Sequence, residues 1–188
     1  MKSLAATIAI AAAATLSAVA KPIDVGPAVG ATVPQLSVTD TSGQSRTVAS
    51  LSGERGLVLV FVRSADWCPF CQKQLIELKD AQGPLAERGY RLAAISYDDP
   101  GVLVSFTEER EIGYPLLSDK GSVTIDAFNL RDPQYPADSR AAGVPLPAIF
   151  VLSPQGVVQA KMAEEGYKTR PPLSVILEAV DALPAPPQ

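Results

Sequence analysis

Continuous apolar runs are the clearest feature of the chain. Leu57–Val62 reads LVLVFV and Tyr90–Tyr97 reads YRLAAISY. Runs of this kind are typical of strands that are buried on both faces of a sheet. Shorter runs beside turn residues predict an N-terminal β-hairpin, a further strand and a C-terminal hairpin. These shorter predicted strands are Gln35–Asp40, Gln44–Val48, Tyr114–Leu117, Ala148–Leu152 and Val157–Met162.

Helical segments alternate with these strands. The predicted helices are Pro69–Asp80, Val102–Arg110, Val123–Phe128 and Leu173–Leu183. Gly83-Pro84 is expected to break or kink the helical region that starts at Pro69. A long loop, residues 131–147, holds four prolines. This order predicts one α/β domain at residues 35–183, with a parallel pair of strands extended by antiparallel strands and helices on both faces.

Both ends of the chain differ from this domain. Residues 1–20 combine Lys2, an uncharged Ala-rich run and small residues at 18–20, which is the pattern of a cleaved signal peptide. The alternative is a membrane anchor, but about 17 mostly small apolar residues are marginal for spanning a bilayer. We expect export to a bacterial periplasm, with no membrane span after cleavage. Residues 21–34 form a Pro/Gly-rich lead-in segment, and residues 184–188 a flexible tail.

Composition narrows the possible chemistry. The 188 residues include no histidine and only two cysteines, with a net charge of −4. Ser-His-Asp hydrolysis and His-ligated metal sites therefore lack a required side chain, and one chain cannot build a four-thiolate site. The acidic balance argues against nucleic-acid binding. We expect no cofactor and no metal.

The two cysteines lie in WCPFC, residues 67–71, between a predicted buried strand and the following helix. A thiol at a helix N-terminus faces unpaired N–H groups, which stabilise its thiolate. Pro69 suits the first helical turn. Helical spacing places Cys71 on the inward face and Cys68 at an exposed tip, so Cys68 is the expected nucleophile and Cys71 the resolving thiol.

Two other interpretations of the cysteines remain open. A structural disulfide that closes so short a loop would stabilise the fold by at most about 2 kcal/mol. Half of an intersubunit metal site would need further ligands from a second chain. The strand–CxxC–helix context favours a redox-active dithiol over both.

Five segments carry a resemblance to a known family. They are LVLVFV, SADWCPFC, AISYDDP, YPLLSD and VPLPAIFVL. The second resembles the active site of the thioredoxin superfamily, and together they are similar to its redoxin branch, the AhpC/TSA family, over about residues 28–183. The resemblance implies a thioredoxin-like fold, a central mixed β-sheet flanked by helices with an N-terminal β-hairpin extension. It also implies a Cys68–Cys71 disulfide and a cis-proline beside it, at Pro147 after Leu146, with Pro145 as the alternative.

Two chemistries follow from this resemblance. In thiol–disulfide exchange, Cys68 attacks a substrate disulfide and Cys71 resolves the mixed disulfide. In peroxide reduction, Cys68 becomes a sulfenic acid that condenses with Cys71. Peroxiredoxins carry Pro and Thr or Ser where this chain has Phe61 and Ala65, so exchange is the leading hypothesis. A redox-inert binding module with a structural disulfide is a third.

Residues near the motif have candidate roles. Trp67 is expected to shield one side of the dithiol, with core packing as the alternative, and Phe70 lies between the cysteines. Arg63 is a candidate charge near the thiolate, or simply a strand-end side chain. Thioredoxins carry a buried acid where this chain has Val62, so proton transfer would use water, Asp66, or one of the acids at residues 164–165.

Other segments could border the site. Tyr97 and Asp98 follow the second buried strand, although a helix-capping role is equally open for Asp98 or Asp99. The 131–147 loop suits a lid or a partner-facing role. The expected partners are protein or small-molecule thiols and disulfides, hydroperoxides and an external dithiol reductant. The expected state is a monomer or weak dimer.

Overall fold

The computed structural model describes residues 21–184. The predicted signal peptide, residues 1–20, and residues 185–188 of the predicted tail lie outside the described residues. Within the described part, no helix combines the length and the apolar character needed to cross a membrane.

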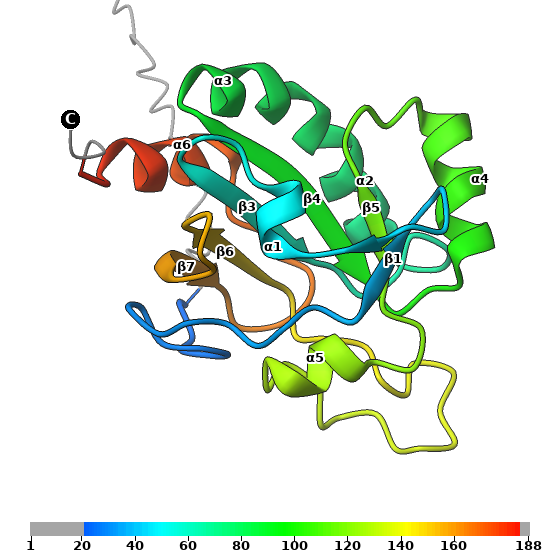
Figure 1. The fold of residues 1–188 in the computed structure, drawn as a ribbon. Coiled ribbons are helices and arrows are strands. Elements are labelled where there is room, and N and C mark those ends of the chain that lie inside the picture. Colours follow the sequence, from blue (N-terminus) through cyan, green and yellow to red (C-terminus); the bar gives the residue numbers. More distant parts are fainter. Residues whose placement is uncertain (1–20, 185–188) are drawn as a thin grey trace, which may run out of the picture.

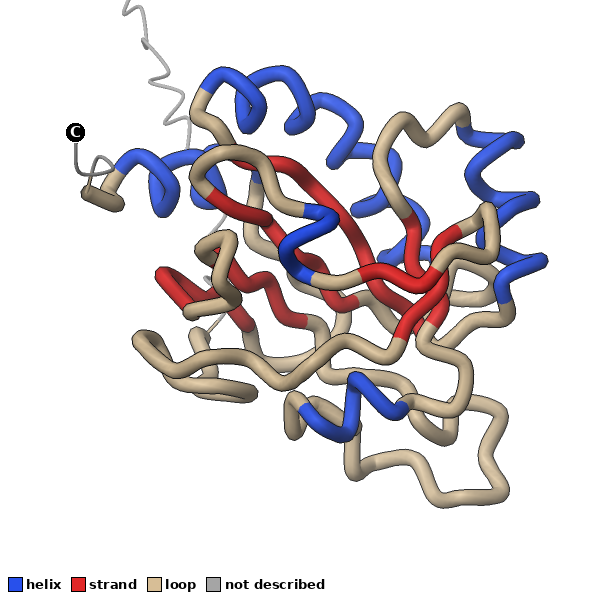
Figure 2. The backbone as a smooth tube through the Cα atoms, in the orientation of Figure 1, coloured by secondary structure: helices blue, strands red, loops and turns tan. Residues whose placement is uncertain are grey.

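A seven-stranded mixed sheet forms the centre of the described molecule (Figure 2). Its strands lie in the order β2-β1-β5-β4-β3-β6-β7. β3, β4 and β5 run parallel, whereas the remaining pairs are antiparallel. The structure thus adds β5 to the predicted parallel pair. The strands are β1 Val38–Asp40, β2 Ser45–Arg46, β3 Gly56–Phe61, β4 Tyr90–Ser96, β5 Leu116–Ser118, β6 Ala148–Leu152 and β7 Val158–Ala163.

Helices cover both faces of this sheet (Figure 1). α2, α3, α4 and α6 pack on one face, and α1 and α5 pack on the other. Alternate residues of β3 enter the two apolar clusters, which explains why its whole sequence is apolar. The helices are α1 Val48–Leu51, α2 Pro69–Glu77, η1 Leu78–Ala81 (a 3-10 turn), α3 Gln82–Glu87, α4 Pro100–Arg110, α5 Val123–Ala127 and α6 Leu173–Asp181.

The predicted break at Gly83-Pro84 is wrong in its position. Both residues lie in the first turn of α3, where the missing N–H of Pro84 is tolerated. The α-helix is interrupted earlier, by η1, because a proline ring crowds the carbonyl four residues before it and the preceding turn tightens. A second difference is that α4 begins two residues before the predicted start, because Pro100 takes the first helical position.

The predicted N-terminal hairpin is confirmed in a shorter form, since Val48 already belongs to α1. Its turn is held by the carboxylate of Asp40, which accepts hydrogen bonds from the backbone and hydroxyl of Ser42, the Gln44 N–H and Arg46. Burial tends to raise the pKa of Asp40, but these hydrogen bonds outweigh it and lower the pKa to about 2. The ionised carboxylate therefore stabilises this edge of the sheet.

Candidate active site

The two cysteines form a disulfide at the start of α2, just beyond the carboxyl end of β3. Cys68 is the N-cap residue, and its Sγ accepts a hydrogen bond from the Cys71 N–H at 3.3 Å. Pro69 occupies the first helical position, where no hydrogen bond is lost. The dithiol therefore faces the positive end of the α2 dipole, as the sequence predicts.

The exposure predicted for Cys68 is wrong. Cys68 is 1% exposed and Cys71 is fully buried. Residues 164–172, which connect β7 to α6 and which we call the strap, pack beside the dithiol. The ring of Tyr167 in the strap meets Phe70 edge to face, with 5.9 Å between the ring centres. Periodicity along α2 separates the two sides of that helix, but it carries no information about a segment so far along the chain.

A cation from the strap contacts the disulfide. The Arg170 Nη2 group donates to Cys71 Sγ at 3.6 Å, and its Nε donates to Gln74 Oε1 at 2.9 Å. Burial and, to a smaller degree, nearby Arg63 lower the pKa of Arg170 to about 10, against the opposing effect of Glu164. Arg170 is a candidate site residue that the sequence did not reveal, because 99 positions separate it from Cys71.

The Arg63 guanidinium lies among three aromatic rings. Its guanidinium carbon lies 5.0 Å from the ring centre of Trp67, 4.9 Å from Tyr135 and 4.3 Å from Tyr167. Its Nη2 donates to the Tyr135 hydroxyl at 2.5 Å, while its buried Nε has no hydrogen-bond partner among residues 21–184. Arg63 thereby joins the dithiol loop, the 131–147 loop and the strap through cation–π contacts.

Asp98 fixes the loop that precedes the dithiol. Its carboxylate accepts hydrogen bonds from the Ser64 hydroxyl at 2.8 Å, the Ala65 N–H at 2.7 Å and the Ser96 hydroxyl at 2.8 Å. Burial raises the pKa of Asp98, and the three hydrogen bonds oppose this shift. The structure thus supports the site-bordering alternative for Asp98, whereas Asp99 takes the N-cap position of α4 without a side-chain capping bond.

Trp67 belongs to a second set of contacts, with the 131–147 loop. Its indole Nε1 donates to the Tyr97 hydroxyl at 2.9 Å, and that hydroxyl donates to the Arg140 carbonyl at 2.9 Å. Arg140 also forms an ion pair with Asp66 at 2.8 Å, and both of these side chains are exposed. The long loop therefore lies directly beside the dithiol loop.

The predicted cis-proline is wrong, because residues 21–184 contain no cis peptide bond. Pro147 directly precedes β6, whose Ala148 pairs with Phe61, so Pro147 lies at the end of the sheet from which the dithiol loop departs. The Leu146 N–H donates to the Leu130 carbonyl at 2.7 Å, and Pro145 forms an isolated antiparallel β-bridge with Arg131. These two contacts hold the segment before β6 in an extended conformation. The peptide bond before Pro147 is trans, which is the lower-energy isomer.

The acidic candidates for proton transfer differ in their surroundings. Glu165 is exposed, whereas Glu164 has a buried Oε2 with no hydrogen-bond partner among the described residues. Within residues 21–184, no three His, Cys, Asp or Glu side chains are grouped in a way that could hold a metal ion. The chemical resources of the site are therefore a dithiol, a helix N-terminus, the buried guanidinium of Arg63, the half-buried guanidinium of Arg170 and aromatic rings.

The chain resembles known proteins. The sequence model that describes the AhpC/TSA family matches residues 29–161. Peroxiredoxin Q of Gentiana triflora is 29% identical over 130 residues, which cover 69% of this chain and 56% of that protein. The thiol-disulfide oxidoreductase ResA of Bacillus cereus is 25% identical over 141 residues, which cover 74% of this chain and 72% of that protein.

Solved structures share the fold. Peroxidoxin BcpB of Mycobacterium tuberculosis superposes with a TM-score of 0.70 at 23% identity, covering 84% of this chain and 98% of that chain. This likeness confirms the predicted thioredoxin-like architecture, a mixed sheet flanked by helices.

Proposed function

The chain belongs to the AhpC/TSA family and is an oxidoreductase, and we propose that its reaction is thiol–disulfide exchange, with Cys68 as the nucleophile and Cys71 as the resolving thiol. The observation that carries this proposal is the Cys68–Cys71 disulfide at the N-terminus of α2. A pair that is already bonded within one helical turn can close or open its disulfide without a large movement of the backbone.

The proposed reaction starts from the reduced protein. The Cys68 thiolate attacks one sulfur of a substrate disulfide, and the departing thiolate takes up a proton. Cys71, as a thiolate, then attacks Cys68 Sγ, closes the protein disulfide and releases the second substrate thiol. Two electrons pass from the protein to the substrate, and an external dithiol returns them by the reverse steps.

The surrounding residues support these steps. The α2 N-terminus and the Cys71 N–H favour negative charge on Cys68, and Arg170 favours it on Cys71. Asp98 acts as a positioning residue, because it holds the loop and not the sulfur atoms. We assign Trp67 and Phe70, with the trans-bonded Pro147 and its neighbour Leu146, to the border of the site where a partner would approach.

Peroxide reduction is the second candidate, and the peroxiredoxin relatives favour it. Cys68 would attack a peroxide oxygen, forming a sulfenic acid and releasing water or an alcohol. Cys71 would then displace water from that sulfenic acid and close the same disulfide. Phe61 and Ala65, at the positions where peroxiredoxins carry Pro and Thr or Ser, favour exchange as the main reaction.

A stopped-flow experiment tests the proposal. Trp67 is the single tryptophan and adjoins Cys68, so oxidation of the reduced protein should change its fluorescence. We expect a faster phase with hydroxyethyl disulfide than with hydrogen peroxide, and Cys68→Ser should abolish it. A fast peroxide phase with a slow disulfide phase would establish the peroxidase instead. A protein whose thiols are reduced but which reacts with neither would be a module with a structural disulfide.

The location and the electron donor complete the proposal. The pattern of residues 1–20 supports export to a bacterial periplasm, a compartment in which disulfides persist. There an external dithiol would serve as reductant, and protein or small-molecule disulfides would serve as substrates. Fractionation of cells that express the full chain, with and without residues 1–20, tests this location.

A further inference from the structure

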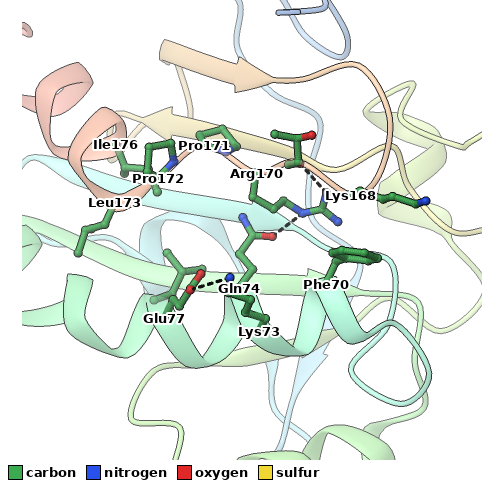
Figure 3. Close-up of a pocket in the computed structure, with 12 residues that line it drawn as sticks. Phe70, Lys73, Gln74, Glu77, Lys168, Arg170, Pro171, Pro172, Leu173 and Ile176 are labelled. Carbon is green, nitrogen blue, oxygen red and sulfur yellow. Dashed lines mark hydrogen bonds and ion pairs between the residues drawn. The ribbon is translucent and has the colours of Figure 1, made fainter. Parts of the chain in front are cut away.

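A groove of about 430 Å³ lies between α2, the strap and the first turn of α6 (Figure 3). Its apolar lining includes Phe70, Leu78, Leu173 and Ile176. Phe70 is 36% exposed, although most aromatic side chains of this protein are buried. Grooves of this volume with an apolar lining hold small organic ligands in many proteins.

The groove is basic although the chain is acidic. Lys73 lies on the α2 side, Lys168 and Arg170 lie on the strap side, and Glu77 is the single carboxylate that lines it. The chain as a whole carries a charge of −4. Lys73 and Glu77 are 3.6 Å apart, but both side chains are more than 60% exposed, so this pair is weak and leaves Lys73 able to bind another anion.

One end of the groove lies close to the dithiol, although neither cysteine is among the residues that line it. Phe70 stands between the two cysteines in the sequence, and the Arg170 guanidinium that lines the groove donates to Cys71 Sγ. A ligand in the groove would therefore have one end against Arg170, the side chain that contacts Cys71. Its other groups would meet the two lysines and the apolar lining.

We propose that this groove recognises short peptide-like disulfides that carry carboxylates, with glutathione disulfide as the experimental probe. The assignment rests on the proposed exchange reaction and adds the substrate class. Lys73 and Lys168 pair with the carboxylates, and the apolar lining takes the methylene groups. In the balanced reaction, the protein dithiol and one glutathione disulfide give the protein disulfide and two glutathione thiols, through a Cys68–glutathione mixed disulfide.

Three disulfides of different charge provide the test. The rate constants of the reduced protein are measured with glutathione disulfide (anionic), hydroxyethyl disulfide (neutral) and cystamine (cationic), by Trp67 fluorescence. Glutathione disulfide should be favoured over cystamine, and this preference should shrink as salt is added. The quantity compared is the rate constant with glutathione disulfide divided by the rate constant with hydroxyethyl disulfide. A change in the intrinsic reactivity of the dithiol affects both rate constants and cancels in this ratio.

Charge-reversal variants test which lysines bind the carboxylates of the substrate. Lys73→Glu and Lys168→Glu should each lower the ratio by roughly five- to tenfold, because a favourable contact becomes a repulsion. Lys120→Glu is the matched control, since Lys120 is exposed to a similar degree but lies outside the groove, beside Asp99. It should leave the ratio within about twofold of the unmodified protein.

The outcomes separate the two proposals. If the protein reacts with disulfides but both groove variants keep the wild-type ratio, the groove does not recognise carboxylates and this inference is wrong. Equal losses in all three lysine variants would mean that only net charge matters, which also overturns it. If the unmodified protein reacts with none of the three disulfides, the exchange reaction itself fails.

Discussion

Replacement of Arg170 by Gln tests how strongly the strap controls the dithiol. Arg170 places one cation 3.6 Å from Cys71 Sγ. A positive charge stabilises the reduced form when that form carries a thiolate, because the disulfide has no net charge to attract. Loss of the cation should therefore destabilise the reduced protein and make the reduction potential more negative.

The contact distance sets the size of this effect. Two unit charges 3.6 Å apart interact by roughly 4–5 kcal/mol at an effective dielectric constant of about 20, which is an upper limit. Net contributions of hydrogen bonds to charged groups are about 1.5–3 kcal/mol. Since about 30 mV corresponds to 1.4 kcal/mol for a two-electron couple, Arg170→Gln should lower the potential by about 30–60 mV.

Equilibration in graded dithiothreitol buffers, read by Trp67 fluorescence, measures this shift. Arg170→Lys keeps a charge and should recover part of it, while Arg91→Gln, at an exposed position near the start of β4, should have no effect. Thermal unfolding verifies that each variant is folded. A folded Arg170→Gln protein whose potential moves by less than about 10 mV, or moves upward, would refute this electrostatic account.

Three further predictions concern stability and pH. Asp98→Ala removes three hydrogen bonds and should lower the free energy of unfolding, measured in urea, by about 2–4 kcal/mol. Its neighbour Asp99 is exposed, so Asp99→Ala should lower it by less than about 1 kcal/mol. Similar losses in the two variants would contradict the positioning role of Asp98. Tyr97→Phe should cost about 1 kcal/mol and shift the emission of Trp67, and unchanged emission would mean that the indole has no such partner. Because the pKa of Asp40 is lowered to about 2, its stabilisation is fully present above about pH 4 and is lost as the pH falls through 2. Asp40→Asn should therefore cost about 1–2 kcal/mol at pH 7 and clearly less near pH 2, so an equal cost at both pH values would exclude this linkage.

Much of the fold could be predicted from local patterns. β6 matches its predicted range Ala148–Leu152, because an apolar run bounded by turn residues leaves little choice of structure. The placement of the dithiol at the start of α2 follows from the order strand, CxxC and helix. These features depend on residues that are close together in the sequence.

The parts that the sequence did not reveal depend on distant segments. Arg170 contacts Cys71 only because the strap returns across α2 after β7. The family resemblance predicts a cis bond before Pro147, but the pairing of Pro145 and Leu146 with the segment after α5 holds an extended backbone with a trans bond. No local pattern carries this information.

The hydrogen bonds of Asp98 also have a consequence for how the protein matures. They join the dithiol loop to the end of β4 across 34 positions, so they form only after β3 and β4 have paired. Before that moment a newly made chain has the same two cysteines, but they are open to solvent and have no guanidinium beside them, so their reactivity is that of ordinary thiols. Oxidation of Cys68 and Cys71 in such a chain is governed by its surroundings, and the protein sets its own redox behaviour only once the tertiary structure is complete.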